Sequence, residues 1–326
     1  MADCRGLAVL GLAAMLALWP TTAQAEVTFD WATVGNAGNA DDTHGDGYGG
    51  VGYEYRISKY EVTAGQYTEF LNAVAATDDN GLYNSSMWTS NYGCKIQQSG
   101  SPGSYTYSVA ADWADRPVNY VSWYDAARFA NWTTTGNTET GVYNTSTWAA
   151  LAHETAAADL GVSTAYFIPT ENEWYKAAYH KNDGVTGNYF EYPTSSDSTP
   201  SNDLIDPDPG NNATYSIAGV DYTIGSPYWR TEVGAHENSE SPYGTFDQGG
   251  NVWEWNETAI GSSRGVRGGS FSSYDAGLHA SHRGNDDPTF EGYGIGIRVA
   301  SIPEPGSITL LVCGLVATLV WWKRWR

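Results

Sequence analysis

A change in hydrophobic period marks the first two elements predicted from the chain. Alternate residues from Val51 to Ile57 are apolar, which predicts a strand with one buried face within residues 51–62. From Thr63 onward the apolar side chains recur every three or four residues, at Tyr67, Phe70, Leu71 and Val74. Thr63 and Gln66 have the spacing of a capping box, so a helix is expected to begin there.

Two more helices are predicted from the same capping pattern. Ser122 is followed three residues later by Asp125, and this helix is expected to run to about Trp132. Thr170 and Glu173 repeat the pattern at the start of a third helix. In each pair a side chain at the first position accepts from a free backbone N–H, which favours initiation of the helix at that point.

The rest of the chain has little periodicity. Residues 78–116 and 182–212 are rich in Gly, Ser, Asn and Thr and are predicted to be long loops. Short strands around glycine-rich turns are expected over 266–271 and 294–299. Together these features predict an α+β domain with little regular secondary structure and long loops.

The first 25 residues are typical of a secretory signal peptide. Arg5 provides the positive start, an apolar run follows, and small residues end at Ala25, where signal peptidase is expected to cut. The alternative is a membrane anchor that is never cleaved. Cleavage is favoured because nothing after Ala25 continues the apolar run.

The last residues, 302–326, have three parts in a fixed order. Pro303, Glu304 and Pro305 come first, followed by a short apolar run and a basic end. The basic end is expected to stay on the cytoplasmic side, which places the body of the protein outside. The order resembles the PEP-CTERM sorting signal, and this resemblance implies that an exosortase cuts near these prolines. We therefore expect a chain that is transiently anchored in the inner membrane and then delivered to the cell envelope or extracellular surface, with residues 26–301 as its single domain.

The composition of the chain excludes several classes of partner. Its formal net charge is −21, whereas proteins that bind nucleic acid or anionic lipid are basic. Its 14 Trp and 23 Tyr exclude a disordered chain and provide ample material for a core. The membrane is therefore expected to be contacted only through the C-terminal tail. An acidic domain of this kind is suited to holding cations.

The chain has three cysteines, of which Cys4 and Cys313 belong to the two terminal segments. Cys94 alone remains in the domain, so the mature chain cannot form an intrachain disulfide. Such a lack is unusual in an exported protein, and bound calcium is an alternative source of stability.

Six motifs occur in order along the domain and resemble those of the formylglycine-generating enzyme, or sulfatase-modifying factor, family. They are Ile57–Thr63, Arg116–Ala127, Ile168–Trp174, Gly250–Trp255 (GNVWEW), Arg267–Phe271 and Gly296–Arg298. The resemblance implies a variant of the C-type lectin fold, with a small twisted sheet and long loops. This fold agrees with the α+β pattern derived above.

The enzymes of this family oxidise a sulfatase cysteine to formylglycine, using copper held by two cysteines. Soft thiolate ligands suit Cu(I). Counting back from Arg283 by the family spacing places these cysteines at Asp275 and Ala280, and neither residue is a cysteine. Copper is therefore not expected, and neither is formylglycine generation.

Two histidines stand in this former active-site region. His279 and His282 are three residues apart, so they could chelate a transition metal if they lay on a helical turn. An oxidoreductase of altered chemistry is therefore an alternative function. The simpler interpretation is that both histidines line a loop and only form hydrogen bonds or packing contacts.

The resemblance also implies structural calcium. In the family the GNVWEW loop surrounds a calcium ion, which corresponds here to carboxylates of Asp247 and Glu254 and carbonyls of Gly250 and Val252. Calcium takes six to eight hard oxygen ligands, and the loop can supply part of this set. The alternative is that Glu254 forms only a local cap or ion pair. A second family site corresponds to Asn212 and Asp221.

Without the thiols, the domain is predicted to be a non-catalytic module that binds a glycan, peptide or protein outside the cell. Aromatic side chains in loops commonly anchor such ligands. The candidates singled out from the sequence are Trp88, Tyr92, Tyr105, Tyr107, Tyr228 and Trp229.

Overall fold

The structure is a computed structural model that describes residues 27–43 and 47–303. The predicted signal peptide and most of the predicted sorting tail lie outside these residues. Of the predicted processing residues, Ala25, Glu304 and Pro305 are outside, and Pro303 is the last residue described. No helix in the described ranges is long and apolar enough to cross a membrane.

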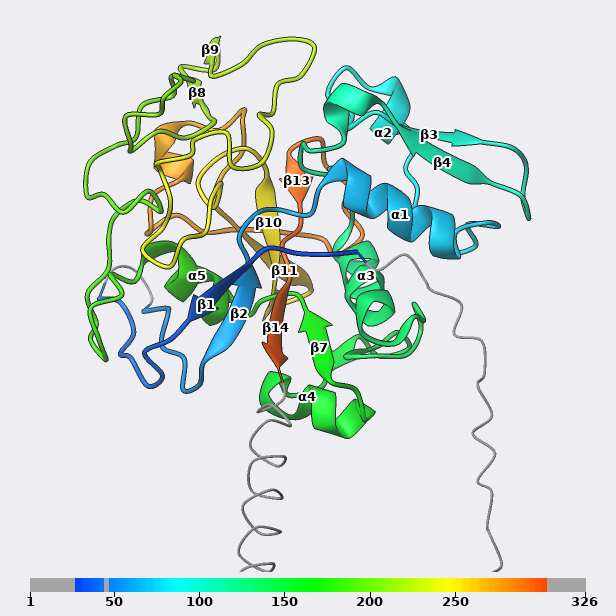
Figure 1. Cartoon of the computed structure of the whole chain (residues 1–326), viewed down its shortest axis with the longest axis horizontal. Coiled ribbons are helices and arrows are strands. Elements are labelled where there is room, and N and C mark those ends of the chain that lie inside the picture. The colour runs from blue at the N-terminus through cyan, green and yellow to red at the C-terminus, as the bar shows by residue number, and fades with distance from the viewer. Residues whose placement is uncertain (1–26, 44–46, 304–326) are drawn as a thin grey trace, which may run out of the picture.

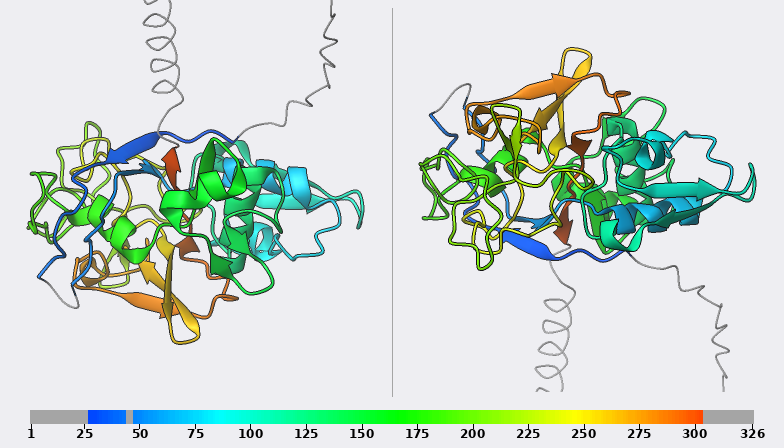
Figure 2. Two further views of the ribbon diagram at one scale, coloured as in Figure 1. Left: turned by 90° about the horizontal axis from the view of Figure 1, so that it is seen from below. Right: turned by 90° about the horizontal axis from the view of Figure 1, so that it is seen from above.

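The first sheet joins the two ends of the described chain. Its strands lie in the order β1 (Trp31–Val34), β2 (Tyr55–Ser58), β14 (Ala300–Pro303) and β7 (Thr164–Phe167). Each neighbouring pair is antiparallel. The described chain begins and ends on the same side of the domain, as both views in Figure 2 show. The sequence predicted β2 but not β1 or β7.

The second sheet carries the GNVWEW motif. Its order is β12 (Gly284–Asp286), β11 (Ser263–Arg267), β10 (Trp253–Ile260) and β13 (Ile295–Gly296). β10 runs antiparallel to β11 and parallel to β13. Because β13 and β14 are close in the chain, this sheet and the first one lie next to each other in the centre of the domain (Figure 1).

All three predicted capping boxes form. α1 (Ala64–Val74) begins after Thr63, α3 (Trp123–Thr135) after Ser122, and α5 (Glu171–Tyr179) after Thr170. α3 continues beyond the predicted end at Trp132 and stops at Gly136, which adopts the left-handed conformation that favours glycine. Aromatic side chains of α1 and α3 meet in the core, where the centroids of Phe70 and Phe129 are 5.3 Å apart.

The prediction of a continuous loop over 78–116 was wrong. This segment contains α2 (Ser86–Thr89), the hairpin of β3 (Ile96–Ser99) and β4 (Thr106–Val109), and the 3-10 helix η1 (Ala111–Trp113). The hairpin projects to one side of the domain (Figure 1). Most of its side chains are polar, so its alternation of apolar and polar residues is weak. Residues 182–212 contain only isolated bridges, as expected of a loop.

The remaining elements are short. They are β5 (Tyr143–Asn144), β6 (Ala149–Ala150), α4 (His153–Leu160), β8 (Ser216–Ile217), β9 (Asp221–Tyr222) and the 3-10 helix η2 (Asp275–Gly277). The mixed α and β architecture with long loops is confirmed.

Candidate functional site

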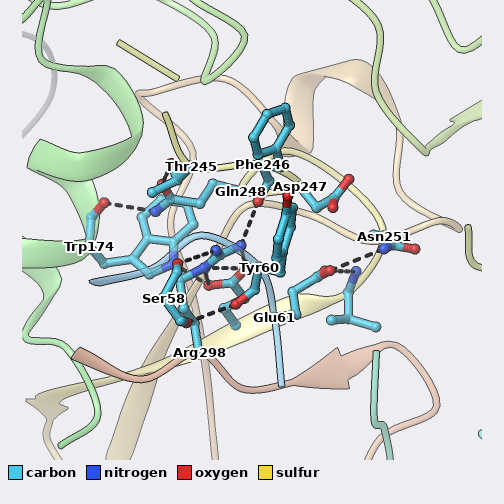
Figure 3. Close-up of polar contacts among 12 residues, drawn as sticks. Ser58, Tyr60, Glu61, Trp174, Thr245, Phe246, Asp247, Gln248, Asn251 and Arg298 are labelled. Carbon is cyan, nitrogen blue, oxygen red and sulfur yellow. Dashed lines mark hydrogen bonds and ion pairs between the residues drawn. The ribbon is translucent and has the colours of Figure 1, made fainter. Parts of the chain in front are cut away.

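Buried charged side chains meet where the start of β10 faces the turn between β2 and α1 (Figure 3). Arg298, from the link between β13 and β14, holds Glu254 through Nε at 2.9 Å from Oε2 and Nη2 at 2.8 Å from Oε1. Trp174 Nε1 of α5 also donates to Glu254 Oε2, at 2.6 Å. Burial alone would lower the pKa of Arg298, but the charge of Glu254 raises it above its usual value.

Two further carboxylates lie beside this ion pair. Glu61 accepts from the Asn251 side chain at 3.1 Å and from the Val252 N–H at 3.3 Å. Asp247 accepts from the Gly234 N–H at 2.5 Å. Glu61 is buried and Asp247 is half-buried, and desolvation raises the pKa of each carboxyl. The charge of Asp247 raises the pKa of Glu61 further. Glu61, Asp247, Glu254 and Arg298 form what we call the acidic centre. Its three carboxyl groups surround one guanidinium, so they would carry an excess of negative charge when all are ionised.

The backbone of this loop requires glycine at one position. Gly250 has a φ of 90°, and a Cβ there would lie 2.1 Å from the Thr214 carbonyl oxygen. Asn251 N–H donates to that same carbonyl at 2.7 Å. The Asn251 Oδ1 atom is buried and has no hydrogen-bond partner. A buried acceptor of this kind fits a cation or a water molecule.

The two carboxylates predicted as calcium ligands, Asp247 and Glu254, have different surroundings. Asp247, predicted as a calcium ligand, lies in the acidic centre. Glu61 joins it from the first motif, Ile57–Thr63, although the sequence did not indicate it as a ligand. Both oxygens of Glu254 already accept from Arg298 and one from Trp174. This geometry argues against Glu254 as a direct calcium ligand, and agrees with the alternative of an ion pair.

The second predicted calcium pair, Asn212 and Asp221, has other surroundings. Asn212 is buried, and its side-chain amide donates to Asp208 at 2.5 Å. Asp221 lies exposed on β9. Asp208 also accepts from Ser239 Oγ at 2.7 Å. Asp208 therefore organises this loop, and no local pattern in the sequence indicated it.

An ion-pair network fills the former active-site region. Glu171 at the start of α5 accepts from Arg267 at 2.6 Å and from Arg283 at 2.6 Å. Arg267 also donates to the Ala280 carbonyl at 3.0 Å. The Tyr48 ring lies against both guanidinium groups, at 4.9 and 5.2 Å. Asp275, the other predicted position of a family cysteine, is exposed in η2.

The two histidines of this region have different partners. His279 Nε2 lies 2.7 Å from Glu191 Oε2, and its Nδ1 lies 2.9 Å from Ser281 Oγ. The His282 ring lies 5.5 Å from the Trp253 ring. Among the described residues, no three His, Cys, Asp or Glu side chains, either here or in the acidic centre, form a group that could hold a metal ion. The two histidines thus contact different neighbours: Glu191 and Ser281 for His279, and Trp253 for His282.

A pocket of about 220 Å³ opens beside the start of β10. Its lining combines aromatic and polar side chains and consists of Trp253, Ser270, Ser272, Asp286, Phe290, Gly292, Tyr293, Gly294 and Ile295. Of the aromatic residues singled out in the sequence, none lines this pocket, and Tyr107 is buried. Phe290 and Tyr293 are exposed aromatics that sequence reasoning missed.

The loop that forms one wall of the pocket is tied to the start of α3. The Trp123 N–H donates to the Pro288 carbonyl at 3.1 Å, and the Tyr120 N–H donates to the Gly292 carbonyl at 3.0 Å. Glu291 accepts from the Asn84 side chain and shares a hydrogen bond with the Asp125 carboxyl group. Burial raises the pKa of Asp125 to about 7. The wall is thus held by backbone and side-chain bonds.

Comparison with known proteins relates the whole arrangement to one family. The chain is 26% identical over 278 residues to hercynine oxygenase of Mycobacterium tuberculosis, covering 76% of this chain and 52% of that protein. It therefore spans about half the length of this curated relative.

Two solved structures share the fold. CarF matches at a TM-score of 0.51 with 20% identity, covering 84% of this chain and 98% of that one. Treponema denticola variable protein 1 matches at 0.50 with 22% identity, covering 86% and 97%. At these identities the two structures inform only the fold.

The Sulfatase-modifying factor enzyme 1-like domain matches residues 50–302, which include all six motifs, both sheets' central strands and the acidic centre. The chain belongs to this family, the formylglycine-generating enzyme-like proteins.

Proposed function

We propose that this domain is a non-catalytic ligand-binding module, stabilised by calcium and presented outside the cell. The proposal rests on the residues that stand in the former active-site region. Asp275 and Ala280 stand where the resemblance places the two thiols, and beside Ala280 the carboxylate of Glu171 binds Arg267 and Arg283. Cys94 is the only cysteine in the described ranges, and it is buried in the core. Copper chemistry based on thiolates therefore has no ligands here.

The balance of charged groups in the acidic centre favours a bound calcium ion. Glu61, Asp247 and Glu254 face one guanidinium, that of Arg298, so a divalent cation would offset the remaining negative charge. We assign Asp247 and Glu61 as its carboxylates, with the carbonyls of Gly250 and Val252. When bound, the ion would hold the loop before β10 against the turn before α1.

The pocket beside Trp253 is the proposed ligand site. Phe290 and Tyr293 are respectively 47% and 45% exposed, whereas most aromatic residues of the domain are buried or half-buried. Exposed aromatic rings around a concave site are typical of ligand contacts. The ligand class proposed at this level remains a glycan, a peptide or a protein.

Export and surface display follow from the two terminal segments. The described structure supports this proposal only in its layout, because the domain starts and ends on one side (Figure 2). Pro303 pairs with Thr164 as the last residue of β14. An exosortase cut at the following residues would leave the sheet intact. Signal peptidase and exosortase are therefore the proposed processing partners.

An oxidoreductase of altered chemistry is the second candidate. It is favoured by the similarity to hercynine oxygenase and by the presence of His279 and His282 in the former active-site region. The partners of His279, Glu191 and Ser281, weigh against it because both ring nitrogens are engaged.

Metal analysis of the purified full chain separates the two functions. The binding module predicts calcium and no tightly held iron or copper, even after incubation with either metal. One iron or copper per chain that is lost in His282→Ala would favour the oxidoreductase instead. The matched control is His236→Ala. His236 contacts Thr214, away from His279 and His282, so its loss would leave such a metal in place.

A further inference from the structure

Three aromatic side chains border the pocket beside β10. Trp253 is the first residue of β10, while Phe290 and Tyr293 belong to the loop between β12 and β13. Tyr293 is fixed by the Tyr92 ring, whose centroid is 5.1 Å from its own. Aromatic rings that are held in place but exposed offer flat apolar faces at little cost in conformational entropy. Such faces complement the C–H face of a pyranose ring.

The polar groups of the pocket are acceptors and hydroxyls. Ser270 Oγ and Ser272 Oγ are 3.2 Å apart. Asp286 lines the same pocket, and burial, with the charge of Asp287, raises the pKa of its carboxyl. The carboxylate can accept from the vicinal hydroxyl groups of a sugar, and the serine hydroxyls can both accept from them and donate to them.

The charges of the residues that line the pocket limit the charge of its ligand. Among the described residues that line it, none is Lys or Arg. The chain also carries a net charge of −21. A phosphate, a carboxylate or a uronic acid would therefore meet no cation and would be repelled. These charges exclude an anionic ligand, whereas a neutral one needs no charged partner.

The size of the pocket limits what enters it. Its volume of about 220 Å³ is below the ~300–1,000 Å³ typical of sites for drug-sized ligands. One six-membered ring therefore fits better than several residues of a peptide. The tie between the wall and the start of α3, at Tyr120 and Trp123, keeps this shape in the free protein.

We propose that this pocket binds a neutral saccharide, one pyranose ring lying against Phe290 and Tyr293 with its hydroxyls on Asp286 and the two serines. The inference rests on the ligand-binding function proposed above and names the class of its ligand.

The test uses the full chain in detergent and a panel of neutral gluco-, manno-, xylo- and galacto-tetrasaccharides, with tetragalacturonate as the acidic comparison. Isothermal titration calorimetry should show one neutral tetrasaccharide bound per chain. Phe290→Ala, Tyr293→Ala and Asp286→Asn should each weaken that binding by about tenfold or more, which corresponds to the loss of one stacking or charge-assisted contact. Tetragalacturonate should bind at least about tenfold more weakly than the neutral ligand.

Tyr274→Ala is the matched control, because Tyr274 is an exposed tyrosine near the pocket but not in its lining. It should leave the affinity unchanged. If Tyr293→Ala does not fold, Phe290→Ala and Asp286→Asn still decide the result. The inference is overturned if no neutral saccharide binds or if the three variants bind like the wild type. A peptide library whose binding these variants weaken would keep the binding function and reject the saccharide; no ligand of either class would reject both.

Discussion

Arg298 holds both carboxylate oxygens of Glu254 in a place from which solvent is excluded, since neither side chain has any exposed surface. Arg298 also donates to the carbonyls of Ser58 and Phe246, at 2.8 and 2.7 Å. One guanidinium thus connects β10 to the end of β2 and to the loop before the GNVWEW motif (Figure 3).

Arg298→Met should lower the free energy of unfolding by about 3–5 kcal/mol, because it leaves the buried charge of Glu254 without its partner. Glu254→Gln should lower the free energy of unfolding by less than Arg298→Met does. The double variant should recover part of the loss seen in Arg298→Met. Chemical denaturation measures all three. Lys181→Met is the control, since Lys181 pairs with Asp197 at the surface and should contribute about 0–1 kcal/mol. A loss of that small size in Arg298→Met would contradict the assigned role.

Calcium should raise the melting temperature of the wild type, and Asp247→Asn should abolish the increase. A ligand bound only to the folded state stabilises by about 2.7 kcal/mol when its free concentration is a hundredfold above its Kd. Glu254→Gln should instead lower stability equally in calcium and in EDTA, because its main partner is Arg298. Scanning calorimetry in both buffers gives the comparison.

Two variants complete the calcium experiment. Asp79→Asn, a change at an exposed carboxylate, should keep the full calcium effect. Asp221→Asn should keep it as well if only the first site binds the ion. Identical melting of the wild type in calcium and EDTA would reject calcium at the acidic centre.

Asp125 should make the domain less stable as pH rises from about 4 to about 7. Burial raises the pKa of Asp125 from 3.8 to about 7, so the folded state keeps a proton that the unfolded state releases in this window. The contribution of Asp125 to the free energy of unfolding therefore falls as pH rises from about 4 to about 7, and it is constant above about pH 7. Asp125→Asn should remove this slope and add up to about 4 kcal/mol above pH 7. Equal slopes in wild type and variant, measured by urea unfolding, would contradict the assignment.

His153 should contribute stability that is present below about pH 6.5 and lost as pH rises through about 10. Burial alone would lower the pKa of His153, but Glu173 and Glu257 raise it to about 10. Its Nδ1 lies 3.0 Å from Glu173 Oε1, and its Nε2 lies 2.8 Å from Glu257 Oε2, although without the angles of a hydrogen bond. His153→Gln should cost about 3–5 kcal/mol at pH 6 and less at pH 10.

The control for this experiment is His279→Gln. His279 pairs with Glu191 in a partly exposed position, so its loss should cost about 1 kcal/mol or less. Urea unfolding at pH 6, 8 and 10 provides both series. A His153→Gln penalty that is independent of pH would show that the histidine acts by packing alone, against Phe167.

The helix starts could be predicted because their chemistry is local. Thr63 with Gln66 and Ser122 with Asp125 are three residues apart, and each pair forms the bonds its spacing predicts. α4 was missed because Ala152 precedes it without a capping side chain. The β3–β4 hairpin was missed because its side chains are largely polar and carry no clear alternation.

The site was only partly accessible to sequence reasoning. The motif around Gly250 indicated the loop correctly, but the partner of Glu254 lies in a different motif, at Arg298. Glu61 reaches Asp247 only through the fold, because the two come from distant parts of the chain. The pocket wall at Tyr293 depends on tertiary contacts with Tyr92, which no local period encodes.

The central proposal is that this domain has the family fold but does not convert cysteine to formylglycine. The most direct test incubates the full chain with a sulfatase-type cysteine peptide, with and without copper, and analyses the peptide by mass spectrometry. The account predicts that the cysteine remains unchanged in every condition, because Ala280 and Asp275 stand where the resemblance places the thiols. Formation of the aldehyde product in a time-dependent and enzyme-dependent manner would contradict it.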